Sequence, residues 1–175
     1  MKIISSFLIL FGILLLILST NLTIQKFNPY RLAFNEAPNV EITNSSKNPV
    51  KVTIKDLNID LPVKKAKIDS KKWQTYTDAL SYLSSSPAPG DEGNSIIYGH
   101  NWKNLLGNLK KANIGQKITV EFSDGTKKDF ETKYITEVKP SQVSILEKSN
   151  DKRITLYTCS GFLDSKRFVV VATLI

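Results

Sequence analysis

The residues best suited to covalent chemistry in this chain are its single cysteine, Cys159, and its single histidine, His100. Each stands at the end of an apolar, β-like run, residues 155–158 before the cysteine and 96–99 before the histidine. A thiol becomes a good nucleophile when a neighbouring base or cation favours its ionised form. The pair therefore indicates a nucleophile and a base. One thiol cannot form an internal disulfide, and one cysteine with one histidine is too few for a structural zinc site.

Arg167 is the third candidate, because it opens the last apolar run of the chain. If residues 153–158 and 168–174 form neighbouring strands, the loop 160–166 returns Arg167 to the side of Cys159. An acyl-transfer site needs donors for a developing oxyanion, and a guanidinium offers a fixed charge and a planar fork of N–H groups. The backbone N–H of Ser160 or Gly161 would supply another donor. Taken singly, each residue also has a simpler explanation, as a small core side chain, a turn residue or a surface charge.

The body of the chain reads as many short strands separated by turn signals. We expect strands at 52–54, 59–63, 95–98, 117–122, 128–138, 153–158 and 168–174. Asp124-Gly125 predicts a type I′ hairpin, and the apolar spacing in 71–83 predicts a short amphipathic helix. Helical turns are expected at 105–109 and 140–146. This pattern favours a closed β-barrel or a sandwich.

The N-terminus is predicted to be a membrane segment. Residues 3–25 carry no charge, and a spanning helix needs about 20 predominantly apolar residues. A cleaved signal peptide is the alternative, but residues 19–23 contain no small-residue cleavage pattern. We therefore divide the chain into a signal-anchor (1–25), a linker rich in Asn, Ser and Pro (26–50) and a folded domain (51–175). The numbers of basic residues on the two sides of the anchor are nearly equal, so charge does not decide its orientation. We place the body of the chain outside the cell, because N-terminal signal-anchors usually export the part of the chain that follows them.

The chain is basic, with a net charge of +8 and a pI near 9.5. Its lysines occur in scattered pairs without interleaved aromatic residues, so a solvated surface explains them and nucleic-acid binding is not expected. No cofactor or metal is expected.

Several segments together resemble the sortases. Residues 155–159 read Thr-Leu-Tyr-Thr-Cys, which matches the T-L-x-T-C signature of that family, and residues 98–101, Tyr-Gly-His-Asn, resemble its histidine segment. The loop 86–94 is similar to the Pro- and Gly-rich loop that precedes this histidine. Residues 166–172 resemble the final arginine strand. The likeness spans roughly residues 55–175 in the family's order.

The resemblance implies an eight-stranded β-barrel with short helices that acts as a cysteine transpeptidase. Cys159 would attack a sorting motif of the LPxTG type and form a thioacyl-enzyme, which an amine would resolve. That amine would be a peptidoglycan cross-bridge or a pilin lysine. His100 would transfer protons and Arg167 would stabilise the oxyanion, with Thr158, Ser160 and Gly161 lining the substrate site. The family's usual setting is the outer face of the cell membrane in Gram-positive bacteria.

Two departures from the family bear on its classes. Pilus-building sortases often carry an N-terminal lid with Asp-Pro-aromatic, whereas this chain has Asn28-Pro29-Tyr30 close to the membrane segment, so no lid is expected. They also often carry a second membrane segment at the C-terminus, whereas this sequence stops at Ile175. Together these points favour a housekeeping or accessory anchoring enzyme.

The sequence leaves two other functions open. One is a cysteine protease or hydrolase in which water resolves the acyl-enzyme. The order His before Cys disfavours papain-like enzymes, and residues 157–160 lack the Gly-x-Cys-Gly of chymotrypsin-like cysteine proteases. The other is a non-catalytic β-barrel binding module in which Cys159 is buried and unreactive. The sorting motif, the amine acceptor and the oligomeric state are not fixed by the sequence.

Overall fold

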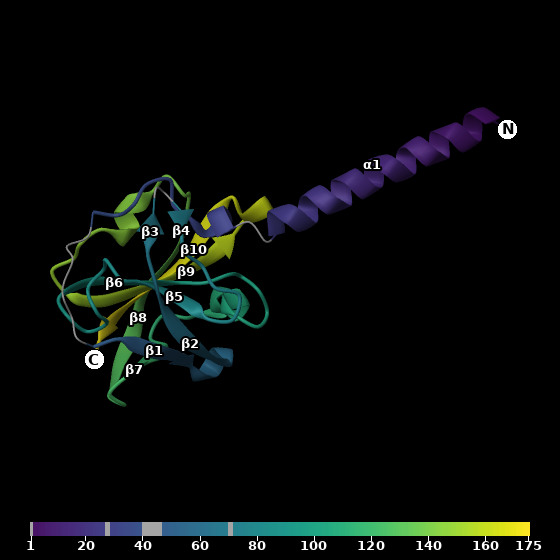
Figure 1. Ribbon diagram of the computed structural model, residues 1–175. Helices are drawn as coiled ribbons and strands as arrows, with labels where there is room; N and C mark the ends of the chain where they lie inside the picture. Colours follow the sequence, from purple (N-terminus) through teal and green to yellow (C-terminus); the bar gives the residue numbers. More distant parts are fainter. Residues whose placement is uncertain (1, 27–28, 40–46, 70–71) are drawn as a thin grey trace.

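The computed structural model describes residues 2–26, 29–39, 47–69 and 72–175. It consists of a long N-terminal helix that projects away from a β-barrel (Figure 1). Helix α1 spans Lys2–Lys26 and is followed by a short 3₁₀ turn, η1, at Pro29–Leu32. Within α1, Ser6–Ile24 has a mean hydropathy of 2.5 and is long and apolar enough to cross a membrane.

Eight strands close into a barrel in the order β1-β2-β5-β6-β9-β10-β8-β7. This confirms the expected closed eight-stranded fold. The strands are β1 (Pro49–Ile54), β2 (Ile59–Ala66), β5 (Leu80–Leu83), β6 (Gly93–Tyr98), β7 (Lys117–Phe122), β8 (Lys127–Val138), β9 (Lys152–Ser160) and β10 (Lys166–Leu174). A separate two-stranded sheet joins β3 (Ile68–Asp69) to β4 (Lys72–Trp73). Two pairings in the barrel, β2 with β5 and β6 with β9, are parallel, and the others are antiparallel.

The helical content of the barrel is limited to short 3₁₀ turns among the described residues. These are η2 (Lys55–Leu57), η3 (Leu106–Lys111), η4 (Val143–Leu146) and η5 (Phe162–Asp164). The turns expected near 105–109 and 140–146 are confirmed by η3 and η4. The helix expected at 71–83 is wrong: its described part contains β4 and β5, joined by bends and irregular backbone at 74–79, and Lys71 lies outside the described residues. All four residues of β5 are buried, whereas an amphipathic helix leaves one face exposed.

The hairpin between β7 and β8 forms where it was expected but with a different turn. A type I′ turn needs a positive φ at both central residues. Here Gly125 has φ 79°, whereas Asp124 is not among the residues with positive φ. The Gly125 N–H donates to Phe122 O at 2.9 Å, and the Phe122 N–H donates to Thr126 O at 2.9 Å. The loop is therefore a type I turn closed by a glycine bulge, which needs left-handed backbone only at Gly125.

Two apolar clusters lie on opposite faces of the same strands. The inner cluster fills the barrel and includes residues from all eight strands, among them Ile97, Leu156 and Val170. The outer cluster lies against the outside of β6, β9 and β10 and includes Tyr98, Tyr157, Cys159, Val169 and Val171, together with Leu32, Phe34 and Trp73. Successive residues of a strand point to opposite faces, so Leu156 points inward while Tyr157 and Cys159 point outward.

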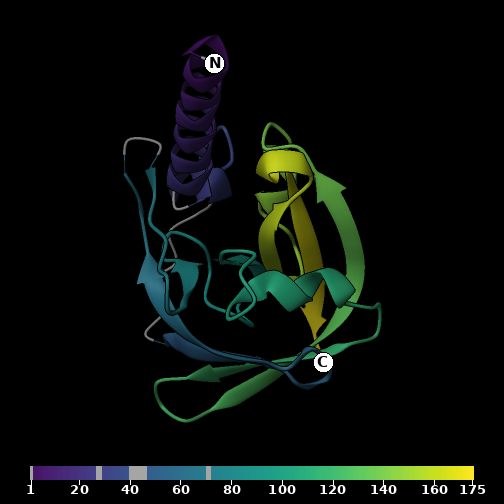
Figure 2. The same cartoon turned by 90° about the vertical axis from the view of Figure 1, so that its right-hand side faces the viewer.

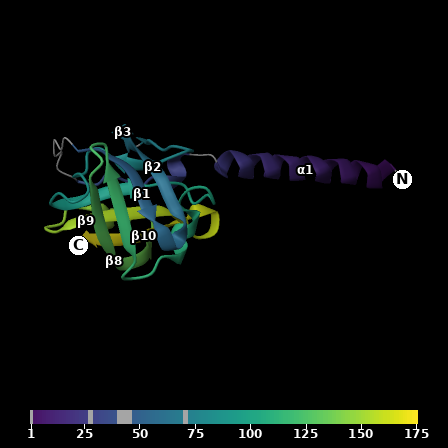
Figure 3. The ribbon, with the colours of Figure 1, turned by 90° about the horizontal axis from the view of Figure 1, so that it is seen from below.

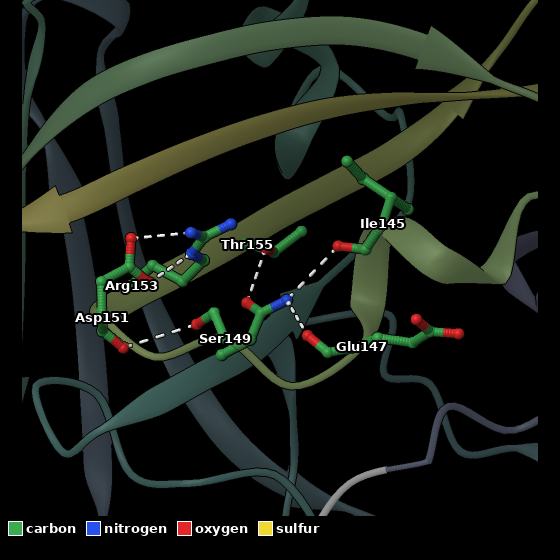
Figure 4. A network of polar contacts seen from close by, with 7 residues as sticks. Ile145, Glu147, Ser149, Asp151, Arg153 and Thr155 are labelled. Carbon is green, nitrogen blue, oxygen red and sulfur yellow. Dashed lines mark hydrogen bonds and ion pairs between the residues drawn. The ribbon is translucent and has the colours of Figure 1, made fainter.

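The connection from β8 to β9, in which Figure 4 labels Ile145 and Glu147, is fixed to the barrel by the Asn94 side chain. Its Nδ2 donates to the carbonyl oxygens of Ile145 at 3.3 Å and Glu147 at 3.2 Å, and its Oδ1 accepts from Thr155 Oγ1 at 2.7 Å. Asn94 and Thr155 are buried. The connection therefore has a defined position beside the strand that carries the cysteine.

Candidate active site

Strand pairing brings the three sequence-predicted catalytic positions into one row. In the antiparallel pair β9–β10, Arg167 lies directly opposite Cys159. In the parallel pair β6–β9, Tyr98 lies opposite Tyr157, so His100 and Cys159 each lie two residues beyond a matched pair. The neighbouring order β6-β9-β10 therefore places His100 on one side of Cys159 and Arg167 on the other. The expectation that the loop 160–166 returns Arg167 to Cys159 is confirmed.

His100 is held in the segment that leaves β6. Its imidazole is buried and stacks on the Trp102 ring, with centroids 4.3 Å apart and planes 9° from parallel. Its backbone oxygen accepts from the Leu106 N–H at 3.0 Å, and the preceding Gly99 oxygen accepts from Thr158 Oγ1 at 2.8 Å. Among the described residues, no hydrogen bond joins the imidazole to the Cys159 thiol.

Arg167 is almost fully buried, with 3% of its surface exposed, and its guanidinium is surrounded by carbonyl oxygens. Nη2 donates to Ala33 O at 2.6 Å, and Nη1 donates to Asp164 O and Lys166 O, both at 2.9 Å. Nε is buried without a hydrogen-bond partner in the described structure. A buried cation with an unused donor is suited to binding an additional oxygen atom.

Residues 31–38, which we call the strap, cover Cys159. The thiol donates a hydrogen bond to Arg31 O at 3.0 Å. Leu32 and Phe34 are buried in the outer cluster, where the Phe34 ring meets the Tyr157 ring edge-on at 5.1 Å. The strap covers the thiol through backbone contacts and not through an Asp-Pro-aromatic motif. The expectation that no lid of that type is present rested partly on Asn28, which lies outside the described residues, so it stays a prediction.

The strap also accounts for part of the predicted linker. Residues 31–34 are half-buried or buried, and the Asn35 N–H donates to Pro140 O at 2.9 Å. Residues 43–46, the most linker-like part of the sequence, lie outside the described residues. The division of the chain into anchor, linker and catalytic domain stays a prediction.

Asp164 connects three segments around the site. Its carboxylate pairs with Arg31 Nε at 3.1 Å and accepts from Asn101 Nδ2 at 3.1 Å. It thereby joins the strap, the histidine segment and the loop between β9 and β10. Asp164 was not among the candidates from sequence, because its partners Arg31 and Asn101 are remote in the chain.

The electrostatics favour neutral groups at rest. Burial raises the pKa of the Cys159 thiol to about 12, and the Arg167 charge opposes this only in part. Burial lowers the pKa of His100, against an opposing effect of the Asp164 carboxylate. A neutral thiol is consistent with its role as a donor to Arg31 O.

The three predicted substrate-binding positions differ in their surroundings. Thr158 and Ser160 alternate with Cys159 along β9, so their side chains point to the opposite face, and Ser160 Oγ is buried without a hydrogen-bond partner. Gly161 has φ 74°, and a Cβ added there would lie 2.8 Å from Ser165 Oγ. A side chain at 161 would therefore strain the loop. No group of three or more potential metal ligands occurs among the described residues.

Comparison with known proteins identifies the family. The Sortase domain model matches residues 52–175. Because this match covers well over half of the 175 residues, the chain belongs to the sortase family. A comparison with curated protein sequences finds no significant match.

Solved sortase structures share the fold. The chain is similar to sortase C-1 from Actinomyces oris at 26% identity and a TM-score of 0.63, covering 73% of this chain and 75% of that one. A lid mutant of sortase A from Corynebacterium diphtheriae matches at 24% identity and a TM-score of 0.63, covering 75% and 73%. Sortase A from Listeria monocytogenes matches at 24% identity and a TM-score of 0.58, covering 73% and 87%.

Proposed function

We propose that this protein is a membrane-anchored cysteine transpeptidase. It would cleave an LPxTG-like sorting motif through a thioacyl-enzyme and transfer the cleaved protein to an amine. Membership of the sortase family supports the class of reaction. The row of His100 just beyond β6, Cys159 on β9 and Arg167 on β10 supports the assignment of roles.

The observation that carries the proposal is how the strap occupies the site. Two carbonyl oxygens of one peptide segment accept hydrogen bonds from the two reactive side chains, Arg31 O from the thiol and Ala33 O from Arg167. The same groups are therefore able to bind the backbone of a peptide substrate. A sorting motif would take the place of the strap.

In the first step Sγ of Cys159 would attack the carbonyl carbon of the scissile peptide bond. The oxygen gains negative charge, which Arg167 is placed to stabilise. His100 accepts the thiol proton and passes it to the leaving amine as the C–N bond breaks, which leaves a thioester on Cys159. In the second step an incoming amine attacks the thioester, His100 takes its proton, and the thiol is regenerated with a new amide.

Displacement of the strap is expected to activate the nucleophile. Burial is the main cause of the high pKa of Cys159, so removal of Phe34 and Leu32 from above it would lower that pKa. Substrate binding and ionisation are then coupled through one segment.

Helix α1 would hold the enzyme in the cell membrane with the barrel on the extracytoplasmic side. Its apolar stretch is compatible with a single membrane span. There the enzyme would meet both its substrate proteins and a peptidoglycan cross-bridge or a pilin lysine.

The test is to mix the full chain, in detergent micelles, with a panel of LPxTG-like peptides and an excess of oligoglycine or other amines. Mass spectrometry would follow an acyl adduct on Cys159 and the ligated product, with Cys159→Ala as the control. An adduct with amine-dependent ligation is expected. An adduct that gives only hydrolysis would indicate a protease, and an unmodified thiol under all conditions would indicate a non-catalytic barrel.

A further inference from the structure

The loop between β9 and β10 presents two apolar side chains to solvent beside the active site. Phe162 is 84% exposed, more than any other large apolar side chain in the described residues, and Leu163 is 53% exposed. We call residues 161–165 the η5 loop. It directly follows Ser160, the last residue of β9, and ends just before Lys166, the first residue of β10. Exposed apolar residues next to one another in a loop are a common feature of surfaces that contact another apolar phase.

The backbone holds these two side chains outward at an energetic cost. Leu163 has φ 50° and ψ 36°, Asp164 has φ 59°, and Gly161 has φ 74°. Left-handed backbone is unfavourable for residues other than glycine, because Cβ approaches the following carbonyl oxygen. The contacts of Asp164 with Arg31 and Asn101 maintain this conformation. The exposure of Phe162 and Leu163 is thus imposed by the surrounding structure.

The η5 loop lies close to the end of the membrane helix. Asp164 pairs with Arg31 at 3.1 Å, and Arg31 follows Lys26, the last residue of α1, by five residues. Two of the five residue-to-residue steps from Lys26 to Arg31 lie within the 3₁₀ turn η1. The Cα atoms of these two residues are therefore at most about 15 Å apart. The polar interface of a bilayer extends roughly 5–7 Å on each side of the hydrocarbon. The η5 loop therefore lies near the point where α1 ends (Figure 1), on the side of the barrel that would face a bilayer spanned by α1.

The side of the barrel nearest α1 also carries positive charge. The η5 loop and η3 both lie on the side from which α1 projects (Figures 1 and 3), and Figure 2 shows both segments from that side. Lys103, Lys110 and Lys111 lie in and before η3 and are exposed. Within the described residues none of the three pairs with a carboxylate. Lysines beside an apolar tip match the anionic headgroups and the acyl boundary of a bilayer.

We propose that the η5 loop is a second membrane contact, in which Phe162 and Leu163 insert into the interface of the bilayer that α1 spans, while Lys103, Lys110 and Lys111 contact anionic headgroups. The proposal depends on α1 being a membrane anchor and is independent of the reaction proposed above. This second contact would fix the orientation of the barrel, because the covalent attachment to α1 and the inserted loop together define the face that lies toward the membrane. Cys159 then lies near the lipid surface.

The test places a fluorescent reporter in the loop of the full chain. Phe162→Trp is reconstituted in vesicles of phosphatidylcholine and phosphatidylglycerol, with or without bromine on the acyl chains, which quenches tryptophan on contact. The matched control is Ser123→Trp at the tip of the β7–β8 hairpin, which Figure 1 places on the far side of the barrel from α1. The wild-type chain gives the background from Trp73 and Trp102.

Several-fold stronger quenching of Phe162→Trp than of Ser123→Trp is expected, together with a shift of its emission to shorter wavelength. Adding Lys110→Glu and Lys111→Glu should reduce this quenching. Equal quenching of the two reporters would overturn the proposal. So would a Phe162→Trp emission that shifts only when a sorting peptide is added, since the loop would then contact the peptide.

Discussion

The two faces of strand β9 differ in what closes them. Leu156 points into a core made by all eight strands of the barrel. Because the barrel is closed, hydrogen-bonded strands surround this side chain. Tyr157 and Cys159 point into the outer cluster, which is covered by a strap that contacts the reactive groups through two backbone oxygens. The inner face serves stability. In the proposed function, a peptide substrate opens the outer face by taking the place of the strap.

The largest expected effect is the loss of activity from changes on the outer face. Cys159→Ala should abolish turnover of a sorting peptide, because no other thiol is available. His100→Ala should lower turnover about 10²–10⁴-fold through the lost proton transfer. Arg167→Ala should lower it about 10²–10³-fold through the lost oxyanion donor.

These effects are measured by amine-dependent ligation, with circular dichroism as the check on folding. Arg167→Lys is the matched control for geometry, because it keeps the charge and loses the fork of donors. If Cys159→Ala still processed sorting peptides, the assignment of the nucleophile would be wrong.

The inner face should show the opposite response. Leu156→Ala is expected to lower the free energy of unfolding by about 2–5 kcal/mol, because it leaves a cavity in a core that is closed on all sides. Cys159→Ala should change it far less, since only a sulfur atom beneath a separable segment is lost. Thermal unfolding of the full chain in detergent micelles, followed by near-ultraviolet circular dichroism, measures both. Equal destabilisation would mean that the two faces are not distinct.

A smaller effect is expected from weakening the strap. Phe34→Ala removes contacts with Tyr157 and Trp73, so the strap should leave the site more often. Alkylation of Cys159 by iodoacetamide should become several-fold faster at neutral pH. Tyr134→Ala removes an exposed aromatic ring from β8 and is the control, with no change expected. An unchanged alkylation rate in Phe34→Ala would indicate that the strap does not limit access.

The last expected effect is the dependence of stability on pH, which appears only away from neutral pH. The pKa of Cys159 is raised by burial from 9.0 to about 12 in the folded protein. The folded state keeps the proton that the unfolded state releases, so this contribution is complete below about pH 9 and falls as pH rises toward 12. His100 has a lowered pKa, so its contribution is complete above about pH 6.5 and falls as pH decreases below that value.

The difference in unfolding free energy between the wild-type chain and Cys159→Ala isolates the thiol from the tyrosines and lysines that also titrate at high pH. This difference should decline between pH 9 and 12. A constant difference over that range would contradict a protonated thiol in the folded state.

Much of the barrel and the row of candidate residues was predictable because both depend on local patterns. Strands alternate in hydrophobicity, and residues 155–159 and 98–101 carry the family's motif in contiguous segments. The helix expected at 71–83 failed because the spacing of Trp73, Tyr76 and Leu80 is also compatible with two short strands joined by a bend. The burial of β5 on both faces distinguishes a strand from an amphipathic helix, and it depends on the neighbouring strands β2 and β6.

The strap was not predictable, for a different reason. Its contacts with Cys159 and Arg167 are made by the carbonyl oxygens of Arg31 and Ala33, and every residue has a carbonyl oxygen. The one side-chain contact with a recognisable charge pattern, Arg31 with Asp164, joins residues far apart in the sequence. The Asp-Pro-aromatic pattern of other lids consists of side chains, whereas this strap contacts the site through its backbone, so that pattern does not reveal it.

The short stretch of chain that joins the strap to β1 has a consequence for competition. The strap is a tethered ligand of its own active site, and a short tether keeps such a ligand at an effective concentration on the order of millimolar. A peptide that diffuses freely must reach a comparable concentration or bind more tightly before it occupies the site. If α1 anchors this chain in the membrane as proposed, a protein confined to the same membrane surface would already have a high local concentration. The tether would then favour substrates by where they are held as well as by their sequence.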